Sequence, residues 1–571
     1  MRLVFAALAN LIRLFFLVLS WPFRLLAQRR RPWYVRFRLE EDPPYRKLKG
    51  RSLRLWRRKP EPASVTSIAE LKWRLELLAR DPRVKGALFE LEGLSVSPAK
   101  RVAIAELIAA FRAKGKQAVG FCTSASNSEY ALLCAMDRIL LPSAGRIELT
   151  GYAAEPMAAG AALRRLGIGA QFVRRGEHKT APELFTNDNV SPIVRETIEV
   201  LLDERYQDLV ATLAKGRSLS EADVRGRIDA GPYSAKRALS SGLCDALVGE
   251  ADLAEFLAKG AQAEPPKEKD GKEKKKAKGG EHAWKIGTFD DYVATLLWPP
   301  IWRRFRRLPR LSLVKIEGMI VPGEGGGSLA KLAGSKAVVK ALRAAARHRR
   351  SKAVLVYVNS GGGAATASEL MLEEVRRLAK KKKVVAYFDQ VAASGGYMVL
   401  LGAHEIWAGP MSLAGSIGVF AGKFEVSTLM DRAGIAREVI TRGRNAGLQS
   451  VSRPFTDGER KALEDEVDEI YEAFLEMAAS ARKMTRDEVH RRGEGRVYSG
   501  RRAVEAGLVD RTGGFEEACR RALQLAGVEG EQFEIAVHSA APRGLPLSSL
   551  FQQLGGTHLL ALWWPGWRFP G

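Results

Sequence analysis

Two glycine-rich turns in the second half of the chain have the composition of catalytic loops. The turns are NSGGG at 359–363 and AASGGY at 392–397, and each follows a strand-like apolar run and precedes a helical pattern. A serine there, Ser394, would place its hydroxyl at a helix N-terminus, where partial positive charge favours developing negative charge. Glycines let a substrate approach and aim amide N–H groups at one point. We therefore nominate Ser394 as a nucleophile and the backbone N–H groups of Gly363 and Gly395 as an oxyanion hole.

Other chemistries fit the residue pattern less well. Glycine-rich strand–helix loops more often bind phosphate or only turn the chain, but 359–363 lacks the GK[ST] ending of a phosphate-binding loop. The cysteines, which lack CxxC spacing, read as small buried apolar residues, and we expect no metal and no cofactor. None of the histidines has a recognisable Ser-His-Asp context; they are His178, His282, His348, His404, His490, His538 and His558.

The chain is an internal duplication. Sliding the sequence on itself gives a constant offset of 267 residues over a long stretch, and the offset then drops to 265. Repeats of this kind are best sought before any fold is assigned. The matched pairs include Leu88 with Leu355, Tyr130 with Tyr397, Gly151 with Gly418, Gly167 with Gly434, and the run 234–245 with 499–510.

The two copies have lost complementary residues. Ser394 of the second copy corresponds to Asn127 in the first, and the triple glycine of the second copy corresponds to Leu-Ser-Val. Conversely, Lys179 of the first copy corresponds to Ala446 in the second. A lone lysine is usually a solvated surface charge, but this reciprocal loss indicates that the copies share one Ser/Lys pair.

A lysine base must be neutral to accept a proton. An unperturbed lysine has a pKa of about 10.4 and is a poor base at neutral pH. Burial against apolar walls lowers that pKa by up to several units. Lys179 would then take the proton of Ser394, the alkoxide would attack a peptide carbonyl, and the protonated lysine would donate to the leaving amine.

The elements expected around these residues alternate between strand and helix. Strands at 353–358 and 384–388 and helices at 364–380 and 395–402 indicate an α/β fold with a mainly parallel sheet and covering helices in each of two tandem repeats. We predict these regions: a membrane anchor or interfacial helix at 1–33, a lysine-bearing repeat at 34–260, a Lys-rich disordered linker at 261–283, an amphipathic aromatic and arginine-rich segment at 284–311, a serine-bearing repeat at 312–530, and a Trp-rich C-terminal extension at 531–571.

Charge and aromatic residues favour a lipid surface as a partner. The 571 residues carry a formal net charge of +26, which implies an anionic partner. Two basic clusters, at 29–31 and 303–310, flank apolar aromatic segments at 3–26 and 292–310, and a third aromatic segment lies at 558–571. No nucleic-acid-binding motif accompanies them. Asn10, Arg13 and other polar residues interrupt the first segment at helical spacing, so both a spanning and an interfacial helix stay open.

Four motifs in this order resemble the long, internally duplicated signal peptide peptidase A group of the S49 serine peptidase family. They are GEHKTAPELF (176–185), NSGGGAATASE (359–369), AASGGYM (392–398) and AGSIGV (414–419), and the resemblance covers about residues 60–250 and 310–525. The chain departs from the family pattern NSPGGS, with Gly361 in place of the proline and Ala364 in place of the last serine.

The resemblance implies more than the residues alone. It implies a Ser394/Lys179 dyad with Ser416 as hydrogen-bond partner of the lysine, and a Clp-protease/crotonase-like fold in each repeat. It also implies a homo-oligomer, a tetramer, seated on the membrane, which degrades cleaved signal peptides and other hydrophobic or unfolded peptides. It suggests the periplasmic face of a bacterial inner membrane, whereas the basic residues 29–31 would favour a cytoplasmic body by the positive-inside rule.

Two other functions were weighed against the peptidase. An acyl-CoA enzyme of the crotonase type shares glycine-rich oxyanion turns but has no use for Lys179. A catalytically inactive membrane scaffold of the same fold would not require both halves of the Ser/Lys pair to survive. The Ser/Lys split therefore favours the peptidase.

Overall fold

A computed structural model describes residues 2–19, 22, 33–46, 65, 67–259, 286–296, 308–326, 331–530, 532–538 and 560–562. The predicted linker at 261–283 lies outside the described residues, as do the basic residues 29–31 and most of the aromatic segments at 292–310 and 558–571. The chain forms two compact units. Residues 1–152 and 206–307 belong to the first, and 153–205 and 308–570 belong to the second.

The first unit is built on a parallel six-stranded sheet with the strand order β10-β1-β2-β3-β5-β9. Its strands are β1 (Tyr34–Glu40), β2 (Gly86–Glu92), β3 (Gln117–Phe121), β5 (Arg138–Leu141), β9 (Ala246–Leu247) and β10 (Ile286–Thr288). A smaller sheet holds β4 (Ser124–Ser126), β6 (Arg146–Glu148) and β8 (Tyr233–Ser234). The helices are α1 (Arg2–Leu19), α3 (Ile68–Ala79), α4 (Pro98–Arg112), α5 (Asn127–Leu133), α9 (Glu221–Asp229), α10 (Ala235–Ser240), η1 (Glu250–Asp252), α11 (Leu253–Lys259) and α12 (Phe289–Ala294).

The second unit repeats this plan, with a parallel sheet in the order β22-β18-β16-β14-β11-β23. Its strands are β11 (Arg310–Glu317), β14 (Ser351–Asn359), β16 (Lys383–Phe388), β18 (Glu405–Ala408), β22 (Arg511–Thr512) and β23 (Glu534–His538). The helices are α6 (Gly160–Arg165), α7 (Glu183–Thr186), α13 (Ser335–Arg347), α14 (Ala365–Ala379), α15 (Gly395–Leu400), α16 (Ser427–Arg432), α17 (Asp457–Arg482), α18 (Arg486–Arg492), α19 (Gly500–Glu505) and α20 (Phe515–Leu525); the boundary between the units falls inside α8 (Pro192–Arg217).

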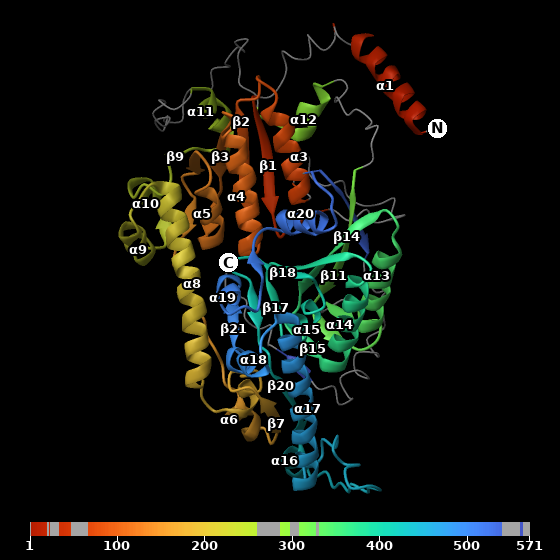
Figure 1. The fold of residues 1–571 in the computed structure, drawn as a ribbon. Helices are drawn as coiled ribbons and strands as arrows, with labels where there is room; N and C mark the ends of the chain where they lie inside the picture. The colour runs from red at the N-terminus through yellow and green to blue at the C-terminus, as the bar shows by residue number, and fades with distance from the viewer. Residues whose placement is uncertain are drawn as a thin grey trace. The chain divides into compact units, whose positions relative to one another are not determined.

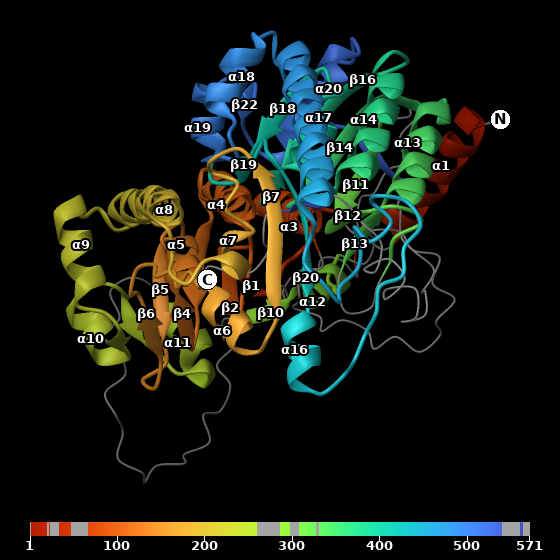
Figure 2. The same cartoon turned by 90° about the horizontal axis from the view of Figure 1, so that it is seen from below.

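Both faces of the second sheet are buried, which explains the unbroken apolar runs in its sequence. Val354 and Val356 of β14 pack into one core with α13 and α14, two helices that lie side by side in Figures 1 and 2. Tyr357 of the same strand points the other way, onto Phe515 of α20. The predicted α/β fold, with a mainly parallel sheet in each of two repeats, is confirmed.

Small sheets at the carboxyl ends of the main strands carry the residues singled out above. One holds β12 (Met319–Val321), β13 (Leu332–Gly334), β15 (Gly362–Ala364) and β24 (Leu560–Leu562), and another holds β17 (Val391–Ala393), β19 (Leu413–Gly415) and β21 (Val497–Ser499). A third pairs β7 (Gly169–Arg175) antiparallel with β20 (Val419–Glu425). By sequence β7 belongs to the first copy, yet it packs in the second unit against β20 and α17 (Figure 2).

The duplication recurs at the level of single contacts. The Tyr130 hydroxyl donates to the Leu243 carbonyl at 2.8 Å, and the corresponding Tyr397 donates to Leu508 at the same distance. Ion pairs recur as well, at 2.8 Å in both Arg217–Asp245 and Arg482–Asp510. The two copies therefore share buried contacts as well as an order of strands.

The N-terminal helix α1 carries exposed apolar side chains, among them Leu11, Phe15 and Val18, each more than half exposed. In the part of the chain that the structure describes, no helix combines the length and the apolar run that a membrane crossing requires.

Candidate active site

Ser394 lies between β17 and α15 in a backbone conformation that side chains rarely adopt. Its φ is 54° and its ψ is −123°, and the residue is fully buried. Such a conformation costs of order 1–3 kcal/mol and persists only where the surroundings impose it. Here the Ser394 N–H donates to the Gly415 carbonyl at 2.8 Å, and the Ala393 N–H donates to Ser360 at 3.1 Å. These bonds fix the serine on the turn that the sequence predicted.

The two glycine-rich turns pack directly on each other. Gly363 pairs with Ile320 of β12, and a Cβ atom at Gly363 would lie 2.0 Å from the Ile320 carbonyl oxygen. A Cβ atom at Gly395 would lie 2.3 Å from Ser368 Oγ and 3.4 Å from the Gly363 nitrogen. Larger side chains would therefore push the turns apart. The structure brings Gly363 and Gly395 together beside Ser394.

Lys179 reaches the serine from the segment that follows β7. Its Nζ lies 2.9 Å from Ser394 Oγ, 3.0 Å from Ser416 Oγ and 3.1 Å from the Ser416 carbonyl oxygen. Only 1% of the lysine is exposed. The first copy thus supplies the lysine to a turn of the second copy, and all three residues belong to the second unit.

Burial changes the chemistry of this lysine. Desolvation lowers the pKa of Lys179 from its ordinary value of 10.5 to about 7. The three oxygens around Nζ belong to hydroxyl and carbonyl groups, so none of these bonds favours the charged form as a carboxylate would. A large fraction of the molecules therefore carries a neutral Lys179 near pH 7, and this neutral amine can accept a proton.

Ser416 is held beside the lysine by its own backbone. Its φ is 52°, and its N–H donates to the Arg496 carbonyl at 2.6 Å. This turn directs both the hydroxyl and the carbonyl of Ser416 at Lys179 Nζ. The position agrees with the role that the family resemblance implied for Ser416.

The corresponding position of the first copy is filled by a structural amide. The Asn127 side chain donates to the Gly151 carbonyl at 2.6 Å and accepts from the Thr150 N–H at 3.1 Å. Asn127 is buried, and these bonds occupy both ends of its amide. That turn therefore has a packing role in the first unit.

Two glycines beside the lysine were not singled out from the sequence. A Cβ atom at Gly418 would lie 3.2 Å from Lys179 Cδ, and one at Gly495 would lie 2.2 Å from the Lys179 nitrogen. Gly418 could have been found, because both copies keep glycine there, at Gly151 and Gly418. Gly495 corresponds to Ala230 in the first copy, so the repeat comparison gave no indication of its importance.

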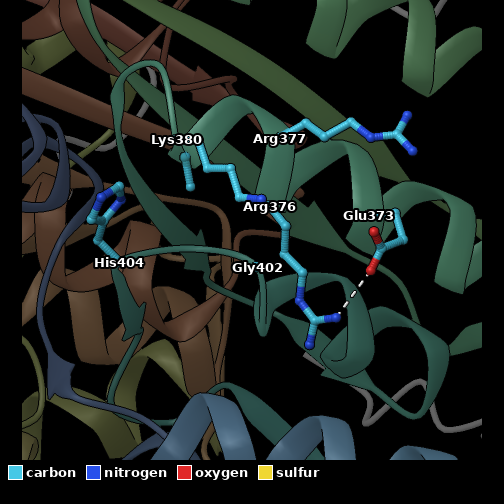
Figure 3. Close-up of a pocket in the computed structure, with 7 residues that line it drawn as sticks. Glu373, Arg376, Arg377, Lys380, Gly402 and His404 are labelled. Carbon is cyan, nitrogen blue, oxygen red and sulfur yellow. Dashed lines mark hydrogen bonds and ion pairs between the residues drawn. The ribbon is translucent and has the colours of Figure 1, made fainter.

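Other polar clusters lie apart from the serine. A hollow beside α14 is lined by Glu373, Arg376, Arg377, Ala379, Lys380, Gly402 and His404. Figure 3 shows Arg376 turned toward Glu373, to which it is bonded at 3.0 Å, and Arg377 directed away from His404. The cations therefore do not converge on one point. The four cysteines are buried, as the sequence predicted.

Comparison with known proteins identifies the family of the chain. The model of Peptidase family S49 matches residues 110–264 and 376–529, one stretch in each copy and together just over half of the chain. The chain is 28% identical over 478 residues to "Serine protease SPPA, chloroplastic" of Arabidopsis thaliana, which covers 81% of this chain and 66% of that protein. It is 27% identical to "Protease 4" of Haemophilus influenzae, over 78% of this chain and 71% of that protein.

Among solved structures, ClpP1 of Listeria monocytogenes is 14% identical and covers 35% of this chain and 91% of that chain, with a TM-score of 0.23. The fold and the family match together define a serine peptidase of the α/β class. The chain belongs to peptidase family S49, which confirms the resemblance found in its motifs.

Proposed function

We propose that the protein is an endopeptidase in which Ser394 is the nucleophile and Lys179 is the general base. The observation that carries this proposal is the 2.9 Å distance between Lys179 Nζ and Ser394 Oγ, made by a lysine that is 1% exposed. A general base must lie within hydrogen-bond reach of the proton it removes and must be unprotonated at the working pH. The position and the lowered pKa of Lys179 satisfy both conditions.

The reaction proceeds through an acyl-enzyme. Neutral Lys179 accepts the hydroxyl proton of Ser394, and the oxygen attacks the substrate's peptide carbonyl. The N–H groups of Gly363 and Gly395 stabilise the oxyanion, and the protonated lysine donates to the leaving amine. Water then attacks the ester with the same lysine as base, which releases the second product and restores Ser394. Ser416 orients Nζ during both proton transfers.

The substrates are cleaved signal peptides and other hydrophobic or unfolded peptides, bound in an extended form. The support comes from β15, whose edge accepts an antiparallel strand, with Gly363 opposite Ala561 and Gly362 opposite Leu562. An added strand gains affinity from main-chain hydrogen bonds, and pockets for alternate side chains give specificity. The strand seated there comes from the leucine-rich run HLLAL, an apolar sequence of the proposed kind.

Membrane association is proposed from the N-terminal helix. Residues 2–19 form α1, and its exposed apolar side chains are suited to the boundary between lipid headgroups and acyl chains. The bacterial Protease 4 relatives support a bacterial origin for the chain. The location we propose is the inner membrane, with the bulk of the protein on the periplasmic face.

A homo-oligomer, a tetramer in the family resemblance, is supported by the internal repeat. Within one chain β20 pairs with β7. The 267-residue offset maps β20 onto 152–158 and β7 onto 436–442, and neither stretch forms a strand in the structure. Met157 and Ile440, one in each stretch, are 75% exposed. If residues 152–158 of one chain pair with residues 436–442 of the next chain, each chain offers one strand and accepts one, which generates a ring.

Hydrolysis of a fluorogenic leucine-rich peptide by the full-length protein tests the proposed chemistry. Wild type is compared with Ser394→Ala and Lys179→Ala, and folding is checked by thermal unfolding. We expect both variants to fall to background while remaining folded. Variants that cleave as fast as wild type would refute the assigned dyad, and an inactive wild type would favour the scaffold.

A further inference from the structure

The turn Glu494–Arg496 links the lysine segment to the segment between β19 and β20 that carries Ser416. The His178 N–H donates to the Glu494 carbonyl at 2.6 Å. On the other side, the Gly495 N–H donates to Ile417 at 2.7 Å, and the Arg496 carbonyl accepts from the Ser416 N–H at 2.6 Å. Three backbone bonds thus connect this turn to the residue before Lys179, to Ser416 and to the residue after Ser416.

The approach of this turn to Lys179 leaves no space for a side chain. Gly495 has a φ of +82°, a conformation that favours glycine. A Cβ atom there would lie 2.2 Å from the Lys179 nitrogen and 2.6 Å from its Cα. Gly176 meets the turn in the same way, since its Cβ atom would lie 2.6 Å from the Glu494 carbonyl carbon. The lysine backbone therefore rests directly on the turn.

A side-chain contact reinforces the backbone bonds. Arg496 Nη1 lies 2.9 Å from His178 Nε2, and Arg496 Nη2 lies 3.5 Å from a carboxylate oxygen of Glu494. Guanidinium only donates, so Nε2 accepts and the ring proton sits on Nδ1. That Nδ1 is buried and has no hydrogen-bond partner among the described residues. An unsatisfied buried donor is destabilising, which argues for a role other than stability.

The same cluster includes a second acid, Glu177. Ligand atoms of Glu177, His178 and Glu494 lie within 4.8 Å of one another, a spacing that could suit a cation. Arg496 already supplies a positive charge to two of the three. Burial and Arg496 both lower the pKa of His178, whereas Glu177, Glu494 and Glu196 raise it. The net lowering keeps the imidazole neutral and able to accept from Arg496.

The two copies can be aligned through this turn by a shared contact. The Tyr233 hydroxyl donates to the Arg227 carbonyl at 2.7 Å, and the Tyr498 hydroxyl donates to the Arg492 carbonyl at 2.7 Å. Both pairs are separated by the 265-residue offset. The residues between them are therefore matched one to one.

In this alignment each copy retains only one of the two residues of the Arg496–His178 contact, as it does for the Ser/Lys pair. Arg496 corresponds to Gly231 in the first copy, and His178 corresponds to Asn445 in the second. Each copy keeps one half of the pair and has lost the other. The contact therefore exists only where the lysine segment of the first copy meets the serine turns of the second.

We propose that Arg496 and His178 form a positioning pair that holds Lys179 in line with Ser394. Arg496 donates to the His178 ring, and this contact holds the backbone of residues 177–179 against the turn 494–496. That turn keeps Lys179 beside Ser416. This inference rests on the proposed dyad. Neither residue touches the reacting atoms, so the effect reaches the reaction only through the placement of Lys179.

Kinetics of four variants test the pair. Displacing a catalytic group by about 1 Å costs up to about 100-fold in rate. We expect Arg496→Ala and His178→Phe each to lower kcat about 10- to 100-fold with KM within about twofold. We expect Arg496→Lys and His178→Gln, which keep a donor or an acceptor, to recover part of that loss. The double variant Arg496→Ala/His178→Phe should be no slower than the single variants.

The pH profile separates positioning from general damage. If Lys179 moves from its buried place, water reaches Nζ, its pKa rises, and the acid limb of kcat against pH shifts upward in Arg496→Ala. Arg460→Ala, which removes an exposed arginine paired with Glu464 on α17, serves as the control and should match wild type. If Arg496→Ala does not fold, the same measurements on His178→Phe and His178→Gln provide the test. An unchanged kcat and acid limb would overturn the pair if Ser394→Ala and Lys179→Ala are inactive; activity in those two would instead refute the dyad.

Discussion

At the scale of single residues, the site depends on removing a lysine from water. The same burial that suits Lys179 to the proposed role of base makes the lysine destabilising when it is protonated, because a buried charge loses its hydration. No carboxylate appears among the hydrogen-bond partners that the structure records for Nζ. The activity and the stability of the protein should therefore depend on the protonation of the same group.

The pH dependence of activity follows from the pKa of Lys179 of about 7. We expect kcat/KM to rise with pH and to level off above an apparent pKa near that value, because only neutral lysine accepts the serine proton. Initial rates measured across this range on the fluorogenic peptide check it. A flat profile through pH 7 would contradict the assignment of Lys179 as the base.

The protonation of Lys179 should also make the free energy of unfolding depend on pH, over a wider pH range than the activity. The folded pKa of Lys179 is about 7 and its ordinary value is 10.5, so the unfolded chain binds more protons between these limits. The free energy of unfolding should therefore rise with pH across that window. Below it the full cost of burying the protonated lysine is present, and Lys179 adds no further pH dependence. Lys179→Met lacks the group. The difference between wild-type and variant denaturant midpoints, followed with pH, isolates the effect, and parallel curves would argue against a lowered pKa.

Sequence comparison between the copies was enough to nominate Ser394 and Lys179, because each stands opposite a reciprocal loss, and the family resemblance implied Ser416. It did not find Gly495 or Arg496. Their importance comes from a backbone approach between residues more than 300 positions apart, and such an approach leaves no periodic pattern in a sequence. Their roles became visible only when the turn was seen against Lys179.

At the scale of elements, strands and helices were predictable and their exchange between the copies was not. The strand predicted at 384–388 is β16, Lys383–Phe388, and the helix predicted at 364–380 is α14, Ala365–Ala379. These follow from local apolar patterns. The pairing of β7 with β20 joins residues about 250 positions apart, so local patterns could not reveal that 153–205 packs in the second unit.

The strand β24 gives an element-scale prediction. Because it occupies the edge of β15 beside Gly363, it competes with any peptide that binds there as a strand. Deleting residues 557–571 should lower KM for the leucine-rich peptide severalfold and leave kcat unchanged, since a tethered competitor acts at a high effective concentration. A synthetic peptide of sequence 557–571 should inhibit the truncated protein competitively.

A proline substitution provides the matched control for the tail. Leu562→Pro removes a backbone N–H from β24 while keeping the length of the chain. It should lower KM in the same direction as the deletion. If both variants retain the wild-type KM, β24 does not occupy the substrate edge.

At the scale of the whole molecule, duplication explains why one chain has one active site. A ring in which residues 152–158 of one chain pair with residues 436–442 of the next chain would contain a second kind of strand junction. At that junction the positions of the serine and the lysine would be held by Asn127 and Ala446, so neither member of the Ser/Lys pair would be present. Under this proposal the internal junction would be catalytic, and the junction between chains would only assemble the ring.

The register of the proposed junction can be tested by cross-linking. The pairing of Ala421 with Val173 in β20 and β7 maps onto Ala154 opposite Ile440. Opposed residues of antiparallel strands have Cα atoms about 4.5–5.5 Å apart, within the span of a disulfide. The double variant Ala154→Cys/Ile440→Cys should therefore form a covalent ladder up to the size of the ring on oxidation. The native cysteines are buried and should not interfere. Ala154→Cys/Val439→Cys, whose side chains would face opposite sides of the junction, is the matched control, and equal ladders or none from the two variants would refute this register.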